Sequence, residues 1–363
     1  LAHGPVIRVA LFDCGPARAQ RLLIAVHHLV IDIVSWAPLL ADLEAAYRTL
    51  AAGSDPHLPP KTTSYAHWAR RLAEFARTPE VRAEVGYWSG AIPTHLPPLP
   101  VDADGADVEG EADAVSIELD EEETRALLEE VPPVYGTQVN DALLAALAQA
   151  LAGWTARGEA LVELEGHGRE DLFEDVDSSR TVGWFTTMYP VLLHAGGDAG
   201  DALRRAKETL RAIPRRGIGY GLLRWVGEPA DRALLAGRAR PEVSFNYLGQ
   251  VDGGPFSAEA GALLVPADGE AAGPGRSPRA PRRHRIAVEG MTAGGRLRMA
   301  FFHGTGVYRR ETVQRLADGY AAALRALIAY CRQGDAGGFT PSDFPEAGLD
   351  QASLDALMAQ LGG

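Results

Sequence analysis

The sequence of 363 residues has little of several features that identify a class of protein. It has two cysteines, Cys14 and Cys331, too few for a disulfide framework or a zinc knuckle. Acidic residues outnumber basic ones by 48 to 35, so the basic footprint of a nucleic-acid binder is missing. No apolar run approaches the roughly 18 residues of a membrane span, and no signal-peptide pattern is visible. We therefore expect a cytoplasmic protein that binds neither nucleic acid nor a membrane.

Several catalytic motifs are absent as well. The sequence contains no Gly-x-Ser-x-Gly nucleophile elbow, and Gly166 and Gly168 complete neither of the common phosphate-loop patterns. Cys14 has no evident base beside it, which disfavours a cysteine nucleophile. These absences leave general acid–base chemistry on a bound substrate.

The sequence patterns predict a layered α/β protein. Hydrophobic residues make up 46% and charged residues 23% of the chain, as in packed globular proteins, and the length suggests about two domains. Apolar periodicity predicts strands at 6–12, 21–30, 115–119, 161–165, 181–193, 242–248, 286–291 and 297–302. It predicts helices at 39–50, 65–77, 121–130, 137–154, 202–213 and 312–330. Composition predicts a linker at 92–114 and a long mobile surface loop at 252–284, whose arginines are either solvated or face an acidic partner.

The segment from His27 to Trp36 is the richest in candidate functional residues. If 22–28 is a strand, His27 and His28 point to opposite faces and cannot serve one site equally. Asp32 can fix an imidazole tautomer or pair with an arginine. The alternatives are a buried structural histidine and a metal site, which a strand disfavours because it separates the imidazoles.

Two further segments carry polar groups at strand ends. Strand alternation places Glu163 and Glu165 on one face, and the glycines that follow permit a tight turn. A desolvated carboxylate there can act as a general base, whereas a solvated surface turn is the simpler alternative. Asn246 and Tyr247 lie on opposite faces of a later strand, and either side chain can donate a hydrogen bond to a developing oxyanion.

Taken together, six segments in order resemble the epimerization domain of nonribosomal peptide synthetases, a branch of the condensation-domain superfamily. The histidine segment alone indicates the superfamily, whereas the segments beginning at Glu165 and Phe245 distinguish the epimerizing branch from peptide-bond formers. The six segments are His27–Trp36, Glu165–Glu170, Arg180–Pro190, Arg216–Trp225, Phe245–Gln250 and Thr340–Pro345.

The resemblance implies a pseudo-dimer of two chloramphenicol-acetyltransferase-like lobes with the active site in a tunnel between them. Residues 1–90 would be the remainder of the N-terminal lobe, residues 91–345 the C-terminal lobe, and residues 346–363 a tail. The family's opening helix and strands, ahead of Gly4 and Pro5, would be absent. We therefore expect the first lobe to be incomplete.

The resemblance also implies an activity, which is epimerization at the Cα of an L-aminoacyl or peptidyl thioester. A peptidyl carrier protein would deliver this substrate on its phosphopantetheine arm, and a neighbouring condensation domain or downstream module would be a further partner. No metal or cofactor would be bound by the domain itself. By position, His28 and Glu165 would be the acid–base pair. Supporting or substrate-lining residues would be His27, Asp32, Ser35, Trp36, Arg169, Asn246 and Tyr247, with Asp32 pairing with Arg169.

One departure from the family pattern leaves other functions open. Ile33 stands where the family has glycine, and its side chain could narrow the tunnel or shift His28. A condensation domain, which joins an amine to a thioester, would need the histidine segment but not Glu165. An inactive domain that recruits partners would need neither.

Overall fold

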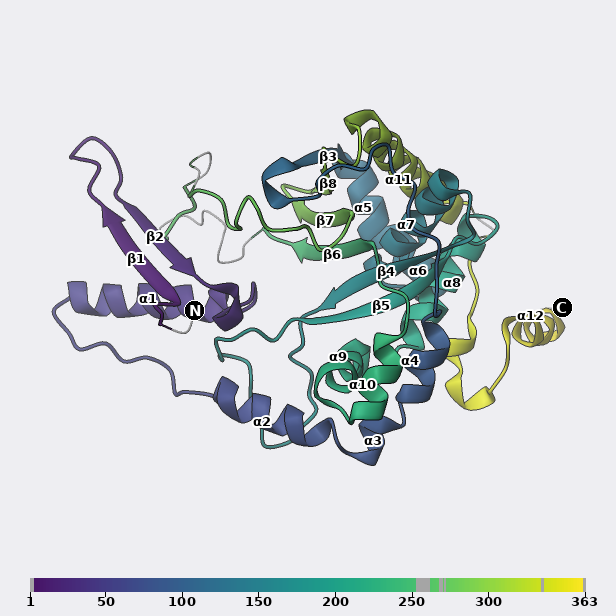
Figure 1. The fold of residues 1–363 in the computed structure, drawn as a ribbon, viewed down its shortest axis with the longest axis horizontal. Helices are drawn as coiled ribbons and strands as arrows, with labels where there is room; N and C mark the ends of the chain where they lie inside the picture. Colours follow the sequence, from purple (N-terminus) through teal and green to yellow (C-terminus); the bar gives the residue numbers. More distant parts are fainter. Residues whose placement is uncertain (1–2, 253–261, 268–269, 271, 334–335, 362–363) are drawn as a thin grey trace.

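The computed structural model describes residues 3–252, 262–267, 270, 272–333 and 336–361, and its central element is a six-stranded mixed sheet (Figure 1). The strand order is β3-β8-β7-β6-β4-β5, with β4–β6 and β6–β7 parallel and the other pairs antiparallel. The predicted α/β class is therefore confirmed. The strands are β3 Ala112–Glu118, β4 Glu159–Gly166, β5 Thr187–His194, β6 Val243–Gln250, β7 Ile286–Ala293 and β8 Arg296–Gly304.

Three helices cover one face of this sheet, on the side away from the N-terminal hairpin (Figure 1). They are α7 Val139–Thr155, α8 Ala199–Arg211 and α11 Arg310–Cys331. Apolar residues alternate along the strands, as in the buried pattern of β7, so each strand buries one apolar row against the helices. Each fully buried Leu, Val or Phe in this core contributes about 1.5–3 kcal/mol.

Shorter helices lie below the sheet (Figure 1), and they pack against the same core or against a second small apolar cluster of Trp68, Phe185 and Ile218. They include α2 Tyr65–Phe75, α3 Pro79–Arg82, α4 Val85–Ala91, α9 Ile218–Gly221 and α10 Pro229–Ala236, and α5 Glu121–Arg125 and α6 Val131–Tyr135 precede α7. Ser64 and Thr78 begin α2 and α3 by accepting a backbone hydrogen bond with their hydroxyls. Trp88 and Ile92 are 1% exposed and belong to the same apolar cluster as the sheet. Residues 65–91, which we grouped with the first lobe, thus share the core of the second.

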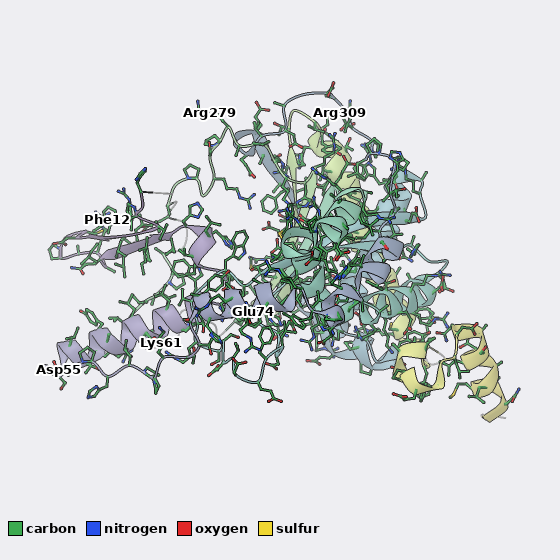
Figure 2. All side chains as sticks on the ribbon, turned by 60° about the horizontal axis from the view of Figure 1, so that its bottom comes forward. Phe12, Asp55, Lys61, Glu74, Arg279 and Arg309 are labelled. Carbon is green, nitrogen blue, oxygen red and sulfur yellow. The ribbon has the colours of Figure 1, made fainter. Side chains whose placement is uncertain are left out.

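The N-terminal region projects from this body as a hairpin and a helix (Figure 1). β1 Ile7–Phe12 pairs antiparallel with β2 Arg21–Val26, and α1 Trp36–Ala51 follows. Figure 2 shows Phe12 on the hairpin and Asp55 just beyond α1, both far from the sheet. No residue of β1 or α1 is buried.

The two irregular segments predicted from composition make specific contacts with other parts of the chain. In the linker 92–114, the backbone N–H groups of Asp102 and Ala103 donate to the Val307 carbonyl, and Val108 pairs with Pro281. Residues 253–261, 268–269 and 271 of the predicted loop lie outside the described residues. The described part from residue 272 to 284 lies against residues 107–110 and forms ion pairs with Asp107, Glu109 and Glu163. Three arginines of this part thus have acidic partners within the chain, and the mobility of the loop stays a prediction.

The chain closes with a short docked segment and α12 Gln351–Leu361. The buried ammonium of Lys207 donates to the Tyr135 carbonyl and the Asp343 carboxylate, each at 2.6 Å. This pairing fastens residues 340–343 to α8. Within the described ranges, none of the helices has the length and apolar character that crossing a membrane requires.

Candidate functional site

A row of polar side chains crosses the sheet face that α7, α8 and α11 leave uncovered. Leu164 pairs with Phe245, so the next residues, Glu165 on β4 and Asn246 on β6, are also neighbours. Asn246 pairs in turn with Glu289 on β7. The amide Nδ2 of Asn246 donates a hydrogen bond of 2.9 Å to the carboxylate Oε2 of Glu165. The structure thus brings together Glu165 and Asn246, two residues that the resemblance assigns to one site.

The surroundings of Glu165 favour its protonated form. Its side chain is open to solvent on one side, but protein atoms crowd the carboxyl. This desolvation raises the pKa of Glu165, and the negative charges of Glu289 and Glu163 raise it further. The positive charge of His28 acts in the opposite direction. His28 is therefore within electrostatic range of Glu165.

Glu163 shares the face of Glu165, as strand alternation predicts, but its environment differs. Its side chain is 6% exposed and forms ion pairs of 2.9 Å with both Arg283 and His284. Burial opposes ionisation, yet the His284 hydrogen bond and the Arg283 charge lower the pKa of Glu163 overall. The pKa values of two glutamates two residues apart are thus shifted in opposite directions, which suits Glu163 to a structural role and Glu165 to proton transfer.

The two adjacent histidines have different surroundings, as predicted, but the cause is not the alternation of a strand. β2 ends at Val26, and the Nδ1 of His27 accepts the Leu29 N–H at 3.1 Å, so His27 caps a short 3-10 helix. The prediction of a strand through residue 30 is therefore wrong. His28 begins that helix, and its ring packs edge-to-face on Trp184 with centroids 5.4 Å apart. His27 shapes the turn and His28 remains available.

Behind the histidines, Asp32 and Ser35 form a buried polar cluster with Arg169. The Asp32 carboxylate accepts hydrogen bonds from the N–H and hydroxyl of Ser35, at 2.8 and 2.6 Å. Arg169 Nη2 donates to Asp32 at 3.3 Å and to the Ser35 hydroxyl at 2.9 Å. The pairing of Asp32 with Arg169 that the resemblance implied is thus present. It links the histidine segment to the segment that follows Glu165.

The same cluster explains why the predicted strand 181–193 begins only at Thr187. The N–H of Phe185 donates to Asp32 at 3.0 Å, and both backbone groups of Gly183 bond to the Ser35 hydroxyl. Because these backbone groups serve distant side chains, they are not available to a sheet ladder. The result is a loop that holds Trp184 against His28.

Three further candidates lie outside this arrangement. Tyr247 is on the helix-covered face, where its hydroxyl lies 2.9 Å from that of Thr292, so the structure does not bring it to Glu165. Trp36 is half-buried at the start of α1. Ile33 is 51% exposed, and it is not among the non-glycine residues with positive φ, so it needs no glycine-specific backbone. Their functional roles stay predictions.

The predicted alternative of a metal site can be compared with the positions of the ligating side chains. Within the part of the chain that the structure describes, no group of three or more His, Cys, Asp or Glu side chains is placed to hold an ion. Asp32 faces Arg169, and His27 uses Nδ1 to cap its own turn.

Two residues of this surface were missed by the sequence analysis. Trp184 lies inside a segment that we expected to be a strand, and only its contact with His28 singles it out. Glu289 is the outward residue between the buried Val288 and Gly290 of β7. Alternation could have placed its side chain outward, but the strand order that sets it beside Asn246 is not visible in one sequence.

Comparison with known proteins agrees with this architecture. A family model described as condensation domain matches residues 1–349. The chain is 42% identical over 369 residues to chondramide synthase cmdD from Chondromyces crocatus, covering 100% of this chain and 9% of that protein. It is 37% identical over 374 residues to tyrocidine synthase 1 from Brevibacillus parabrevis, covering 99% of this chain and 34% of that protein. It therefore spans only a part of the length of these relatives.

A solved structure is also similar. The epimerization domain from the third module of tyrocidine synthetase B superposes with a TM-score of 0.81 at 36% identity, over 91% of this chain and 73% of that one. The family match extends over almost the whole chain, and the mixed sheet has the same fold as in that domain. The chain therefore belongs to the condensation domain family of nonribosomal peptide synthetases.

Proposed function

We propose that the chain epimerizes the Cα of an aminoacyl or peptidyl thioester held on the phosphopantetheine of a peptidyl carrier protein. The observation that carries this proposal is Glu165, a carboxyl with a raised pKa on an open sheet face, within electrostatic range of His28. An acyl transfer that forms an amide has no use for this second group. The similarity to an epimerization domain supports the same activity.

The reaction requires one group to remove the Cα proton and another to return a proton on the opposite face. A thioester makes this proton more acidic than an amide does, and partial desolvation of the site favours its transfer. His28 and Glu165 come from different elements, the 3-10 helix after β2 and the end of β4, so they can approach Cα from two sides. The raised pKa brings Glu165 nearer to the working range of an imidazole.

Neighbouring groups orient this pair. Asn246 fixes one oxygen of Glu165 by its hydrogen bond, and Trp184 restricts the ring of His28. The cluster of Asp32, Ser35 and Arg169 holds the two segments at a constant distance. The thioester arm would come from the carrier protein, and in a synthetase the carrier and a condensation domain would be neighbours of this chain.

The experiment is deuterium incorporation at Cα when a verified loaded carrier protein is incubated with the protein in heavy water. We expect His28→Ala and Glu165→Gln to reduce incorporation at least about 100-fold, the usual loss for a general acid or base. Glu159→Gln is the matched control, because Glu159 is an exposed residue at the opposite end of the same strand. No incorporation by the unchanged protein would contradict the proposal.

A second candidate is amide formation, because the family model that matches the chain is described as a condensation domain. The same loaded carrier, supplied with an amine acceptor on a second carrier, distinguishes the two. Amide product that persists in Glu165→Gln would favour condensation. Carrier binding without exchange or amide formation would favour a recruiting role.

A further inference from the structure

Glu289 is an exposed carboxylate beside the proposed acid–base pair that the mechanism above does not use. It lies on β7 in register with Asn246, which itself is hydrogen-bonded to Glu165. Neighbouring strands lie about 4.8 Å apart, so roughly 10 Å separates the backbones of Glu165 and Glu289, and two extended side chains can shorten that gap. In the described part of the chain, Glu289 has no hydrogen bond or ion pair of its own.

The charged groups that face Glu165 come from several elements. Glu163 from the same strand is ion-paired with Arg283 and His284, whereas Glu289 forms no ion pair within the described residues. His28 approaches from the N-terminal region. Arg276 lies on the segment 272–284, where its guanidinium donates to Glu109 at 2.8 Å. The hydrogen bond to Glu109 raises the pKa of Arg276, and the charges of Glu289 and Glu165 add to this effect.

We propose that Glu289 is a positioning residue of the epimerization reaction, whose carboxylate acts on Glu165 across the amide of Asn246. Arg276, which is paired with Glu109, is the opposing group, because its positive charge acts on both carboxylates. This inference rests on the proposed function, because it assigns Glu289 a part in the same proton transfer.

The physical argument is that of two carboxylates sharing one surface. The negative charge of Glu289 disfavours a second negative charge on Glu165, so Glu165 keeps its proton to a higher pH than it would without Glu289. The negative charge of Glu289 acts in the same direction as the desolvation of Glu165, whereas Arg276 acts against it. Loss of either charge therefore changes the pH at which Glu165 ionises, in opposite directions.

The first test reads the ionisation of Glu165 without any substrate. Carbon-13 NMR of protein labelled at the glutamate carboxyls follows each titration, and the Glu165 signal is the one that Glu165→Gln removes. We expect Glu289→Gln to lower the titration midpoint by about half a pH unit and Arg276→Gln to raise it. Glu289→Asp should retain most of the original midpoint, and Glu159→Gln should leave it unchanged.

The second test measures deuterium incorporation against pH for the same variants. One limb of the plot of incorporation rate against pH should reflect the ionisation of Glu165. We expect this limb to shift with the NMR midpoint, to lower pH in Glu289→Gln and to higher pH in Arg276→Gln. A Glu165 midpoint that is the same in Glu289→Gln as in the unchanged protein overturns the role of Glu289. Absence of incorporation in the unchanged protein contradicts the proposed function instead, and the NMR shift distinguishes the two failures.

Discussion

The N-terminal region and the helix-covered sheet are held in place by different forces. Between residues 7 and 51 only Ile31, Asp32 and Ser35 are buried, and two of these are polar. By contrast, α11 alone buries ten of its 22 residues, and most of them are apolar. Large apolar side chains such as Leu11, at 65%, stay exposed on the hairpin.

This difference bears directly on the proposed site. Glu165 stands on the apolar-packed sheet, whereas His28 stands on the region that polar contacts attach. Those contacts are the Asp32–Ser35–Arg169 cluster and the ion pair between Arg180 and Asp42. The distance between the two proposed catalytic groups therefore depends mainly on hydrogen bonds and charge, with Ile31 and the contact of His28 with Trp184 as the apolar part. Four measurements test this difference between the two regions.

The largest expected effect is in the apolar core. Phe301 is fully buried against Tyr320, with ring centroids 5.5 Å apart. We expect Phe301→Ala to lower the free energy of unfolding by about 3–5 kcal/mol, because it leaves a cavity between β8 and α11. Denaturant unfolding measures this loss. A change below about 1 kcal/mol would contradict the view that this packing dominates stability.

The second largest loss of stability is expected when the polar cluster that attaches the N-terminal region is broken. Asp32→Ala removes the acceptor for Ser35, Phe185 and Arg169, and we expect a loss of about 2 kcal/mol confined to the N-terminal region. Hydrogen exchange by mass spectrometry would show faster exchange over residues 27–51, with α11 unchanged. Asp55→Ala, at an exposed position beyond α1, is the control. Uniform loosening of both regions would contradict the separation that we describe.

A smaller effect is expected at Glu165, and it depends on pH. Its pKa in the folded protein is raised, so the folded state binds more protons than the unfolded state between the ordinary and the raised value. Stability therefore falls as pH rises through that window. Glu165→Gln removes this pH-dependent loss of stability. The melting temperature of the variant should therefore exceed that of the unchanged protein at pH 7, and the difference should be smaller at pH 4. An equal difference at both pH values would contradict the raised pKa.

The smallest effect is expected on the hairpin. Leu11 is mostly exposed, so Leu11→Ser removes little buried apolar surface. We expect the free energy of unfolding from denaturant titration to change by no more than about 0.5 kcal/mol. A loss as large as that of Phe301→Ala would mean that the hairpin face is covered in solution.

Much of this architecture follows from periodicity in the sequence. Alternation places Glu163 with Glu165 and separates Asn246 from Tyr247, and both predictions are confirmed by the strand registers and contacts. Local patterns predict such features because neighbouring residues of a strand alternate whatever the strand pairs with.

The errors have a shared physical cause. Residues 181–186 have strand composition, but Asp32 binds the Phe185 N–H from 153 positions away. The strand before His27 ends early because a side chain caps the next turn. Glu289 becomes relevant only through the order of strands in the sheet. Each of these features depends on a contact between distant residues or on a hydrogen bond from a side chain to the backbone. The periodicity of apolar residues carries no information about either kind of contact.

The Asp32–Ser35–Arg169 cluster also limits how such a chain can be recombined. Its members are separated by up to 137 positions, yet they pair with one another through an ion pair and hydrogen bonds. A chimera with a junction between them would join an aspartate and a serine from one parent to an arginine from another. Exchanges that move both segments together preserve this charge balance, so the cluster marks which pieces of the chain form one unit for engineering.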